Sequence, residues 1–111
     1  MVYERGRRFD GALMSVFVLE NGSEGHRFGV TASRKMSKSA VMRNRAKRLL
    51  RETFRLSDPE LSGLLKKYDW VVNARRSLLV VKVAAPMKEF RAIVARVSEE
   101  ERRESAAAGI S

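Results

Sequence analysis

The stretch that decides the fold is residues 39–59, which read SAVMRNRAKRLLRETFRLSDP. Apolar side chains recur in it at the three- and four-residue spacing of one helix face. Ser37 or Ser39 is suited to cap this helix, because a serine hydroxyl accepts hydrogen bonds from the free amides of the first turn. Pro59 disfavours a longer helix, so we expect it to end near Leu56. The predicted apolar face comprises Met42, Ala46, Leu49, Leu50, Thr53 and Phe54.

The opposite face of this helix is cationic. The whole chain has 23 basic and 13 acidic residues. Ten of the basic residues, but only one acidic residue, Glu52, lie within residues 27–55. Like charges four residues apart on a helix repel each other, as Lys47 and Arg51 would. Phosphate groups from a partner would remove this repulsion and release counterions. We therefore interpret the face as a nucleic-acid-binding surface rather than as an ordinary solvated face.

Asn44 supports this interpretation. Asparagine is a poor helix former, and on the polar face in the middle of the helix it contributes nothing to packing. It is flanked in sequence by Arg43 and Arg45, whose guanidinium groups match the geometry of phosphate. The three side chains together suit a folded RNA surface.

The composition limits the other functions. The chain has 111 residues, a net charge of +10 and 44% hydrophobic residues, which fits one globular domain with a modest core. There is no cysteine, which excludes disulfides, thiolate zinc sites and a cysteine nucleophile. No apolar run reaches the ~20 residues of a membrane span. We expect a cytoplasmic protein, with a single domain over residues 1–104 and a disordered tail over 105–111.

Strands and a final helix are predicted around the cationic helix. Segment 12–20 is rich in β-branched and apolar residues, and segment 26–33 alternates between apolar and polar or small residues. The turn 21–25 between them predicts a hairpin. Pro86 suits the first turn of a C-terminal helix, which carries apolar residues at helical spacing as far as Val97. The other predicted elements are a short helix at 59–66, a strand at 68–75, and a strand or apolar connection at 78–83.

A family resemblance rests on the motif Arg43-Asn44-Arg45-x-Lys47-Arg48-x-x-Arg51, which follows Ser33-Arg34-Lys35. This pattern resembles the signature of the bacterial ribonuclease P protein subunit. Weaker agreement occurs at Tyr3-x-x-Gly6, Phe17-x-Leu19 and Asp69-Trp70-Val71-Val72-x-Ala74-Arg75, so that the resemblance covers roughly residues 3–97. It implies an α/β (α+β) two-layer sandwich with a central mixed sheet, packed helices and a left-handed βαβ crossover.

The resemblance also implies a function. Members of this family bind a large catalytic RNA, and the holoenzyme removes the 5′ leader of precursor tRNA by Mg²⁺-dependent hydrolysis. The chemistry and the metal ions then belong to the RNA, so that no catalytic residue, metal site, protein partner or membrane contact is expected for this chain. The residues implied to bind the RNA subunit are Arg34, Lys35, Arg43, Asn44, Arg45, Lys47, Arg48 and Arg51. Those implied to line a cleft for the single-stranded leader are Tyr3 and the outward strand residues Val16 and Val18.

Two departures from the family pattern bear on the leader cleft. Family members usually begin with a basic N-terminal helix that supplies an aromatic side chain, whereas this chain begins at Met1-Val2-Tyr3. Glu20 stands where the first strand often ends in tyrosine, and its negative charge would repel a phosphate unless it is turned away. We therefore expect the leader site to be weaker than the RNA-subunit site.

Other interpretations are open at the level of sequence. A small basic ribosomal or DNA-binding protein would explain the charge, but not the motif together with its flanking strands. A membrane-surface domain would need the apolar helix face to be free, and a nuclease acting alone would need a carboxylate or histidine constellation. Trp70 is expected in the core, and His26 is expected to have no ligand or general-base role. The acidic side chains interpreted as a solvated helix face are Glu99, Glu100, Glu101 and Glu104.

Overall fold

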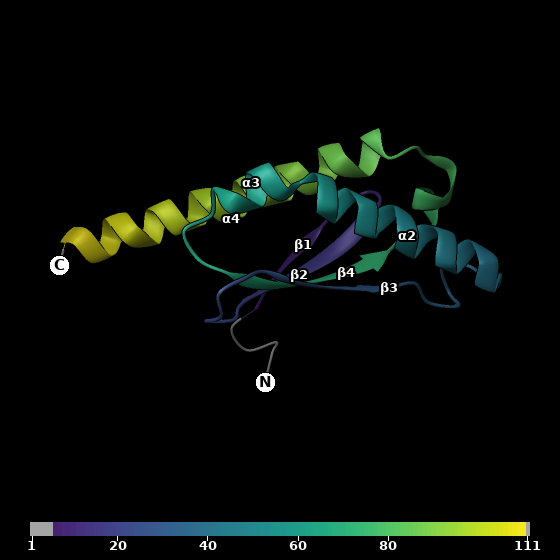
Figure 1. The fold of residues 1–111 in the computed structure, drawn as a ribbon, viewed down its shortest axis with the longest axis horizontal. Helices are drawn as coiled ribbons and strands as arrows, with labels where there is room; N and C mark the ends of the chain where they lie inside the picture. The colour runs from purple at the N-terminus through teal and green to yellow at the C-terminus, as the bar shows by residue number, and fades with distance from the viewer. Residues whose placement is uncertain (1–5, 111) are drawn as a thin grey trace.

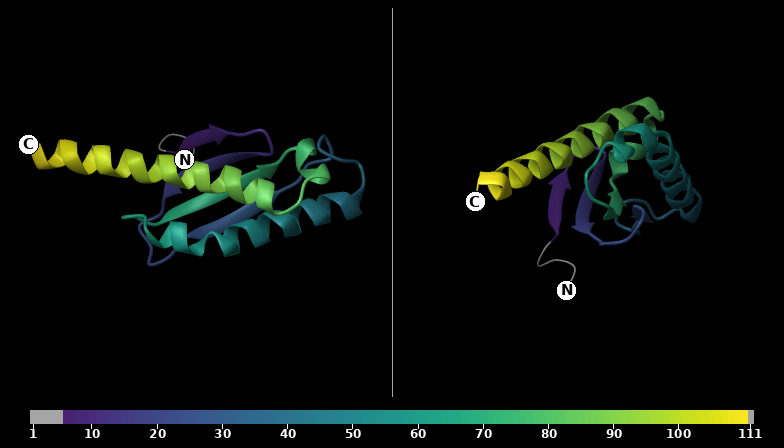
Figure 2. Two further views of the ribbon diagram at one scale, coloured as in Figure 1. Left: turned by 90° about the horizontal axis from the view of Figure 1, so that it is seen from above. Right: turned by 60° about the vertical axis from the view of Figure 1, so that its left-hand side comes forward.

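A four-stranded sheet carries helices on one of its faces (Figure 1). The computed structural model describes residues 6–110, with side chains as far as Ala106. Figure 2 shows the two long helices lying over the same face of the sheet. This α+β architecture with a mixed sheet confirms the predicted fold class. The elements are β1 (Arg7–Asp10), β2 (Met14–Glu20), β3 (Arg27–Thr31), α2 (Ala40–Leu56), α3 (Asp58–Ser62), β4 (Tyr68–Ala74), the 3-10 helix η1 (Arg76–Val80) and α4 (Ala84–Ile110).

The order of the strands is β1-β2-β4-β3, so that β4 lies between the two strands predicted to form a hairpin. β2 is antiparallel to β4, with Val16 opposite Val72, and β3 is parallel to β4, with Val30 opposite Val72. The predicted hairpin is therefore wrong, because a turn signal shows that the chain reverses but not which strands pair. β4 suits the centre, since Trp70 and Val72 are fully buried, whereas β3 carries the exposed Arg27 and suits an edge.

A helical crossover joins the two parallel strands. The chain passes from β3 to its neighbour β4 through α2 and α3. This agrees with the βαβ unit that the family resemblance implies, and its left-handedness stays a prediction. After β4 the chain forms η1, in the region predicted as a strand or an apolar connection, and Leu78 of η1 joins the core.

β1 is a strand that the sequence pattern does not predict. It pairs antiparallel with β2, and the turn between them is held by Glu89 of α4. The Glu89 carboxylate accepts hydrogen bonds from the amides of Ala12, Leu13 and Met14 at 2.7 to 3.2 Å. A Cβ atom at Gly11 would lie 2.3 Å from the carboxyl carbon of Glu89, so a larger residue there would push the carboxylate away from these amides.

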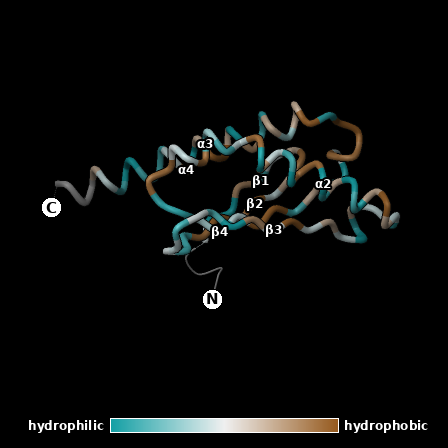
Figure 3. The backbone as a smooth tube through the Cα atoms, in the orientation of Figure 1, coloured by the Kyte–Doolittle hydropathy of each residue, from teal (hydrophilic) through white to brown (hydrophobic). Residues whose placement is uncertain are grey.

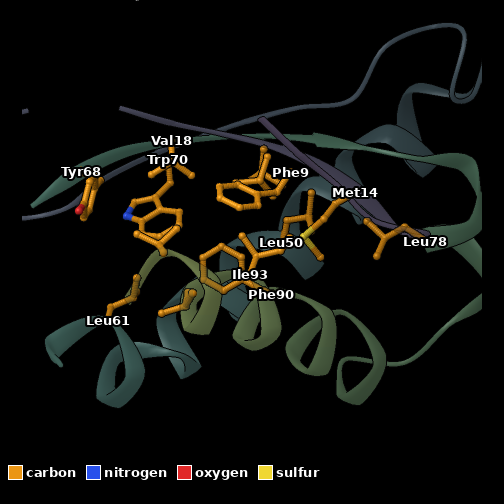
Figure 4. Packing of buried hydrophobic residues seen from close by; sticks show 14 of the residues in the cluster. Phe9, Met14, Val18, Leu50, Leu61, Tyr68, Trp70, Leu78, Phe90 and Ile93 are labelled. Atoms are coloured by element: carbon orange, nitrogen blue, oxygen red, sulfur yellow. The ribbon is translucent and has the colours of Figure 1, made fainter. Parts of the chain in front are cut away.

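The core lies between the sheet and the two long helices (Figure 4). Trp70 of β4 meets Phe90 of α4 edge to face, with ring centroids 5.5 Å apart. Leu50 of α2 belongs to the same cluster, and hydrophobic and hydrophilic residues alternate along α2 in Figure 3. The prediction that Trp70 is a core residue is confirmed, and the apolar side of α2 is covered by the sheet and α4.

α4 is longer than the sequence pattern predicts. It continues to Ile110, so residues 105–110 are helical where a disordered tail was expected. Alanines at 106–108 explain the difference, because alanine has the highest helix propensity. The C-terminal part of α4 extends beyond the sheet in Figure 1. Across the described residues, no helix is both long and apolar enough to cross a membrane.

Glu101 of α4 is buried, and its interpretation as part of a solvated face is wrong. Its carboxylate accepts hydrogen bonds from the amides of Leu65 and Lys66, both at 2.9 Å, and from the hydroxyl of Tyr68 at 2.6 Å. Burial and this carboxylate raise the pKa of Tyr68. Because Glu101 follows Val97 by four residues, the helical spacing of the apolar stripe already places it on the inner face.

His26 links the start of β4 to α3 through its two ring nitrogens. Nδ1 accepts from the backbone amide of Tyr68 at 3.0 Å and from Trp70 Nε1 at 3.1 Å, so Nε2 carries the proton that it donates to the carbonyl of Leu61 at 3.2 Å. Burial lowers the pKa of His26, which favours this neutral form. These contacts account for both ring nitrogens within the described structure.

Candidate nucleic-acid interface

The orientation of α2 is set by its cap and its apolar face. Of the two predicted caps, Ser39 caps the helix, because its Oγ accepts a hydrogen bond from the amide of Met42 at 3.2 Å. Leu50 is 1% exposed, and the ring of Phe54 stacks on Phe28 of β3 with centroids 4.3 Å apart. These contacts bury one side of α2 against the sheet, so the basic side points away from the core.

Seven basic side chains gather on α2 and on the loop before it. Within the described residues, none of them has an ion pair or a hydrogen bond, and the Asn44 amide between them has none either. All are exposed except Lys47, which is partly exposed. The group contains every basic residue predicted for the RNA-subunit site except Arg43, and it adds Lys38. This cationic surface consists of Arg34, Lys35, Lys38, Arg45, Lys47, Arg48 and Arg51.

Two arginines hold the loop 33–38, which supplies three of these cations. Arg43 Nη1 donates to the carbonyl oxygens of residues 37 and 38, at 2.9 and 3.0 Å. Arg76 donates to those of residues 35 and 36, at 3.0 and 3.3 Å. Four consecutive carbonyl groups are therefore bound by guanidinium groups, which orders the loop beside the start of α2.

These two arginines make contacts that the sequence did not predict, and the RNA contact predicted for Arg43 stays a prediction. Arg43, predicted as an RNA contact, directs its Nη1 back to the loop, so that it positions Lys38 and its neighbours. Arg76 was not predicted at all, because it lies outside the motif and 40 residues from Met36, whose carbonyl it binds. Only the packing of the chain after β4 against the loop reveals it.

Acidic side chains of α2 and α4 pair with arginines outside the cationic surface. Arg7 pairs with Glu100 and Glu104 of α4, and Glu52, the acid of α2, pairs with Arg55 near the helix end. In the part of the chain that the structure describes, no three histidine or acidic side chains form a group suited to a metal ion. Positive charge is thus concentrated on one side of α2, an arrangement that attracts and binds polyanions.

Val16 and Val18, predicted to line the leader cleft, lie on the wrong face of the sheet. They are 0% and 5% exposed and point toward the helices, and Figure 4 shows Val18 inside the core. The error has a physical reason, since both sides of β2 are apolar and strand periodicity cannot tell which side is covered. Tyr3, the third predicted cleft residue, lies outside the described residues.

The face of the sheet that points away from the helices carries the alternate residues. Phe17 of β2 stands opposite Val71 of β4, and the guanidinium group of Arg8 lies 5.3 Å from the centre of the Phe17 ring. The face thus has an apolar centre with ion pairs beside it, because Arg8 pairs with Asp10 and Arg27 pairs with Asp69. The open sheet face includes Arg8, Asp10, Phe17, Leu19, Arg27, Asp69 and Val71.

Glu20 is turned away from the open sheet face. It stands opposite Tyr68, whose side chain is buried on the helix side, and its carboxylate lies 3.3 Å from Lys66 Nζ. Glu20 therefore repels phosphate on the open sheet face only weakly, because its carboxylate points to the other side and is paired with Lys66.

Known proteins resemble this chain in sequence and in structure. The family model described as Ribonuclease P matches residues 1–98. The ribonuclease P protein components of Clostridium botulinum and Clostridium kluyveri are each 41% identical over 76 residues, which span 68% of this chain and 66% of each relative. The RNase P protein of Thermotoga maritima has a similar structure, with a TM-score of 0.72, 25% identity and 86% of each chain covered. That of Staphylococcus aureus gives a TM-score of 0.66 at 25% identity, covering 87% of each.

Proposed function

The chain belongs to the ribonuclease P protein family, and on this premise we propose that it is the protein subunit of ribonuclease P. In this role it binds the catalytic RNA subunit through the cationic surface and assists removal of the 5′ leader from precursor tRNA. The observation that carries the proposal is the partner-free state of the seven cations within the described residues, beside an ordered loop. A helix of like charges gains stability when phosphates approach it.

The work assigned to this chain is binding and positioning. Bond cleavage is assigned to the RNA and its Mg²⁺ ions, which supply the nucleophile and stabilise the leaving oxygen when bound there. The carboxylates of the acidic segment in α4 support this division, because Glu101 accepts backbone hydrogen bonds and Glu100 and Glu104 pair with Arg7. Basic side chains between two RNA molecules reduce a repulsion that Mg²⁺ would otherwise have to screen.

We assign the leader to the open sheet face in place of Val16 and Val18. Phe17, Leu19 and Val71 offer an apolar strip for bases. The guanidinium groups of Arg8 and Arg27, which pair with Asp10 and Asp69, offer hydrogen-bond donors for the phosphate backbone. Stacking and backbone charge tolerate any sequence, which suits precursors with varied leaders. The absence of cysteine is compatible with a reducing compartment, and we place this function in the cytoplasm.

Reconstitution tests the proposal. The chain is mixed with a transcribed bacterial ribonuclease P RNA, and cleavage of a precursor tRNA is followed while Mg²⁺ is lowered. We expect cleavage to persist at lower Mg²⁺ with the protein than with RNA alone, and the protein alone to be inactive. Site-specific cleavage by RNA-free protein, or no effect of the protein at any Mg²⁺ concentration, would contradict the proposal.

A further inference from the structure

A groove of about 430 Å³ lies between α2 and the segment that follows β4. Arg45 and Arg48 of the cationic surface form one wall, Leu79 and Val81 form the other, and Leu49 lies between them. Its volume is in the range of pockets that take small organic groups. The groove belongs neither to the open sheet face nor to the loop 33–38.

Apolar and cationic groups meet in this groove. Leu49, Leu79 and Val81 are only partly buried, and Val80 between the last two is 87% exposed. A single exposed apolar residue is ordinary on a protein surface. Here the apolar residues lie beside two guanidinium groups that have no partner within the described residues. The combination fits a ligand with an apolar face and an adjoining negative charge.

We propose that the groove receives one unstacked nucleobase of the RNA partner, with its neighbouring phosphates on Arg45 and Arg48. This inference rests on the proposed function. Single-stranded loops and bulges of folded RNA present such bases, and proteins bind them by apolar and guanidinium contacts to the base face. Glu52 also lines the groove, and its carboxylate can accept a hydrogen bond from the amino group of a base. A base that carries an amino group is therefore favoured over uracil.

Charge distinguishes a nucleotide from an apolar protein side chain as the occupant. Glu52 is already neutralised by Arg55, whereas Arg45 and Arg48 bring two uncompensated positive charges to the rim. An apolar protein segment would cover these guanidinium groups and leave them unpaired, which is unfavourable. A nucleotide carries a flat apolar base and a phosphate together. Its base can contact Leu79 and Val81, and its phosphate can pair with Arg45 and Arg48.

The first test uses the full chain and a transcribed bacterial ribonuclease P RNA. Leu79→Ala removes an apolar wall without removing a charge, so we expect about five- to tenfold weaker binding with an unchanged salt dependence. Leu65→Ala is the matched control, because Leu65 is 67% exposed and does not line the groove. Arg48→Ala should weaken binding and also reduce the salt dependence.

The second test removes bases from the RNA. Base loss is measured first with the native protein, which needs no variant to fold, and then with Leu79→Ala. RNA molecules with random abasic sites are mixed with the protein, and the bound molecules are separated from the unbound ones. Sequencing then identifies the positions at which an abasic site is rare among the bound molecules. We expect one unpaired nucleotide at which removal of the base weakens the affinity of the RNA for the native chain. The same removal should hardly weaken the already lower affinity for Leu79→Ala.

The outcomes separate this inference from the proposed function. If no abasic position depends on Leu79 while Arg48→Ala still lowers affinity and salt dependence, the base site is refuted and the RNA-binding function stands. If Leu79→Ala changes self-association of the chain but not its RNA affinity, the groove is a protein-docking surface and the inference is wrong. If the native chain does not bind the RNA, both proposals fail.

Discussion

The sharpest test of the cationic surface is to remove Arg48 and Arg51 one at a time. Each neutralised phosphate on double-stranded nucleic acid contributes about 0.9 to the slope of log affinity against log salt. Arg48→Ala and Arg51→Ala should therefore each reduce that slope by about 0.9. Between 50 and 200 mM salt, the affinity of the native chain for ribonuclease P RNA should fall about 3.5-fold more than that of either variant. Filter binding or fluorescence anisotropy at four or more salt concentrations measures this difference.

Stability and position provide the controls for this experiment. Both arginines are exposed and have no partner within the described residues, so their removal should change the free energy of unfolding by no more than about 0.5 kcal/mol. Arg102→Ala is the matched control, because Arg102 is an exposed, partner-free arginine of the described part of α4. If Arg48→Ala, Arg51→Ala and the double variant all keep the native slope, the cationic surface is not the RNA interface.

Three further predictions follow from named contacts. Leu50→Ala should lower the free energy of unfolding by about 2–5 kcal/mol in urea titrations, since Leu50 is buried between α2 and the sheet. Arg76→Ala should weaken RNA binding while leaving the urea midpoint within a few tenths of a molar, because it releases two carbonyls of the loop 33–38 and no core group. Burial lowers the pKa of His26 in the folded state, so the unfolded state binds a proton at this side chain more readily. The free energy of unfolding should therefore be highest above about pH 6.5 and should decrease as the pH falls toward 5. This decline should be absent in His26→Gln, and its persistence there would assign the titration to another group.

The cationic helix could be predicted from sequence because its determinants are local. The cap at Ser39, the apolar spacing through Leu50 and the stop before Pro59 all lie within one segment, and the structure confirms each of them. The basic face then follows from geometry alone, since a helix buried on one side exposes the other. The segment did not show that Arg43 would turn back onto the loop, because that contact depends on the path of the chain before the helix.

The sheet could not be predicted to the same extent, because strand pairing and facing depend on distant parts of the chain. β2 has apolar residues on both sides, so Val16 and Phe17 were equal candidates for the core until the helices covered one side. The position of β4 between β2 and β3 has no local signal either. Glu101 is a different case. Its spacing of four residues from Val97 predicts a position on the buried helix face, whereas its charge favoured an exposed one.

The two surfaces assigned to RNA lie on opposite layers of the fold, and β3 connects them. β3 is an edge strand, so no further strand of the described sheet lies beyond it. Its exposed residue Arg27 belongs to the open sheet face, and a few residues later the chain enters the loop 33–38 of the cationic surface. A nucleic acid that follows this edge can pass from one surface to the other without crossing a second layer of protein. Under the proposed function, a thin sandwich with one helical layer allows the catalytic RNA and the leader to be bound at the same time, each by a surface of its own.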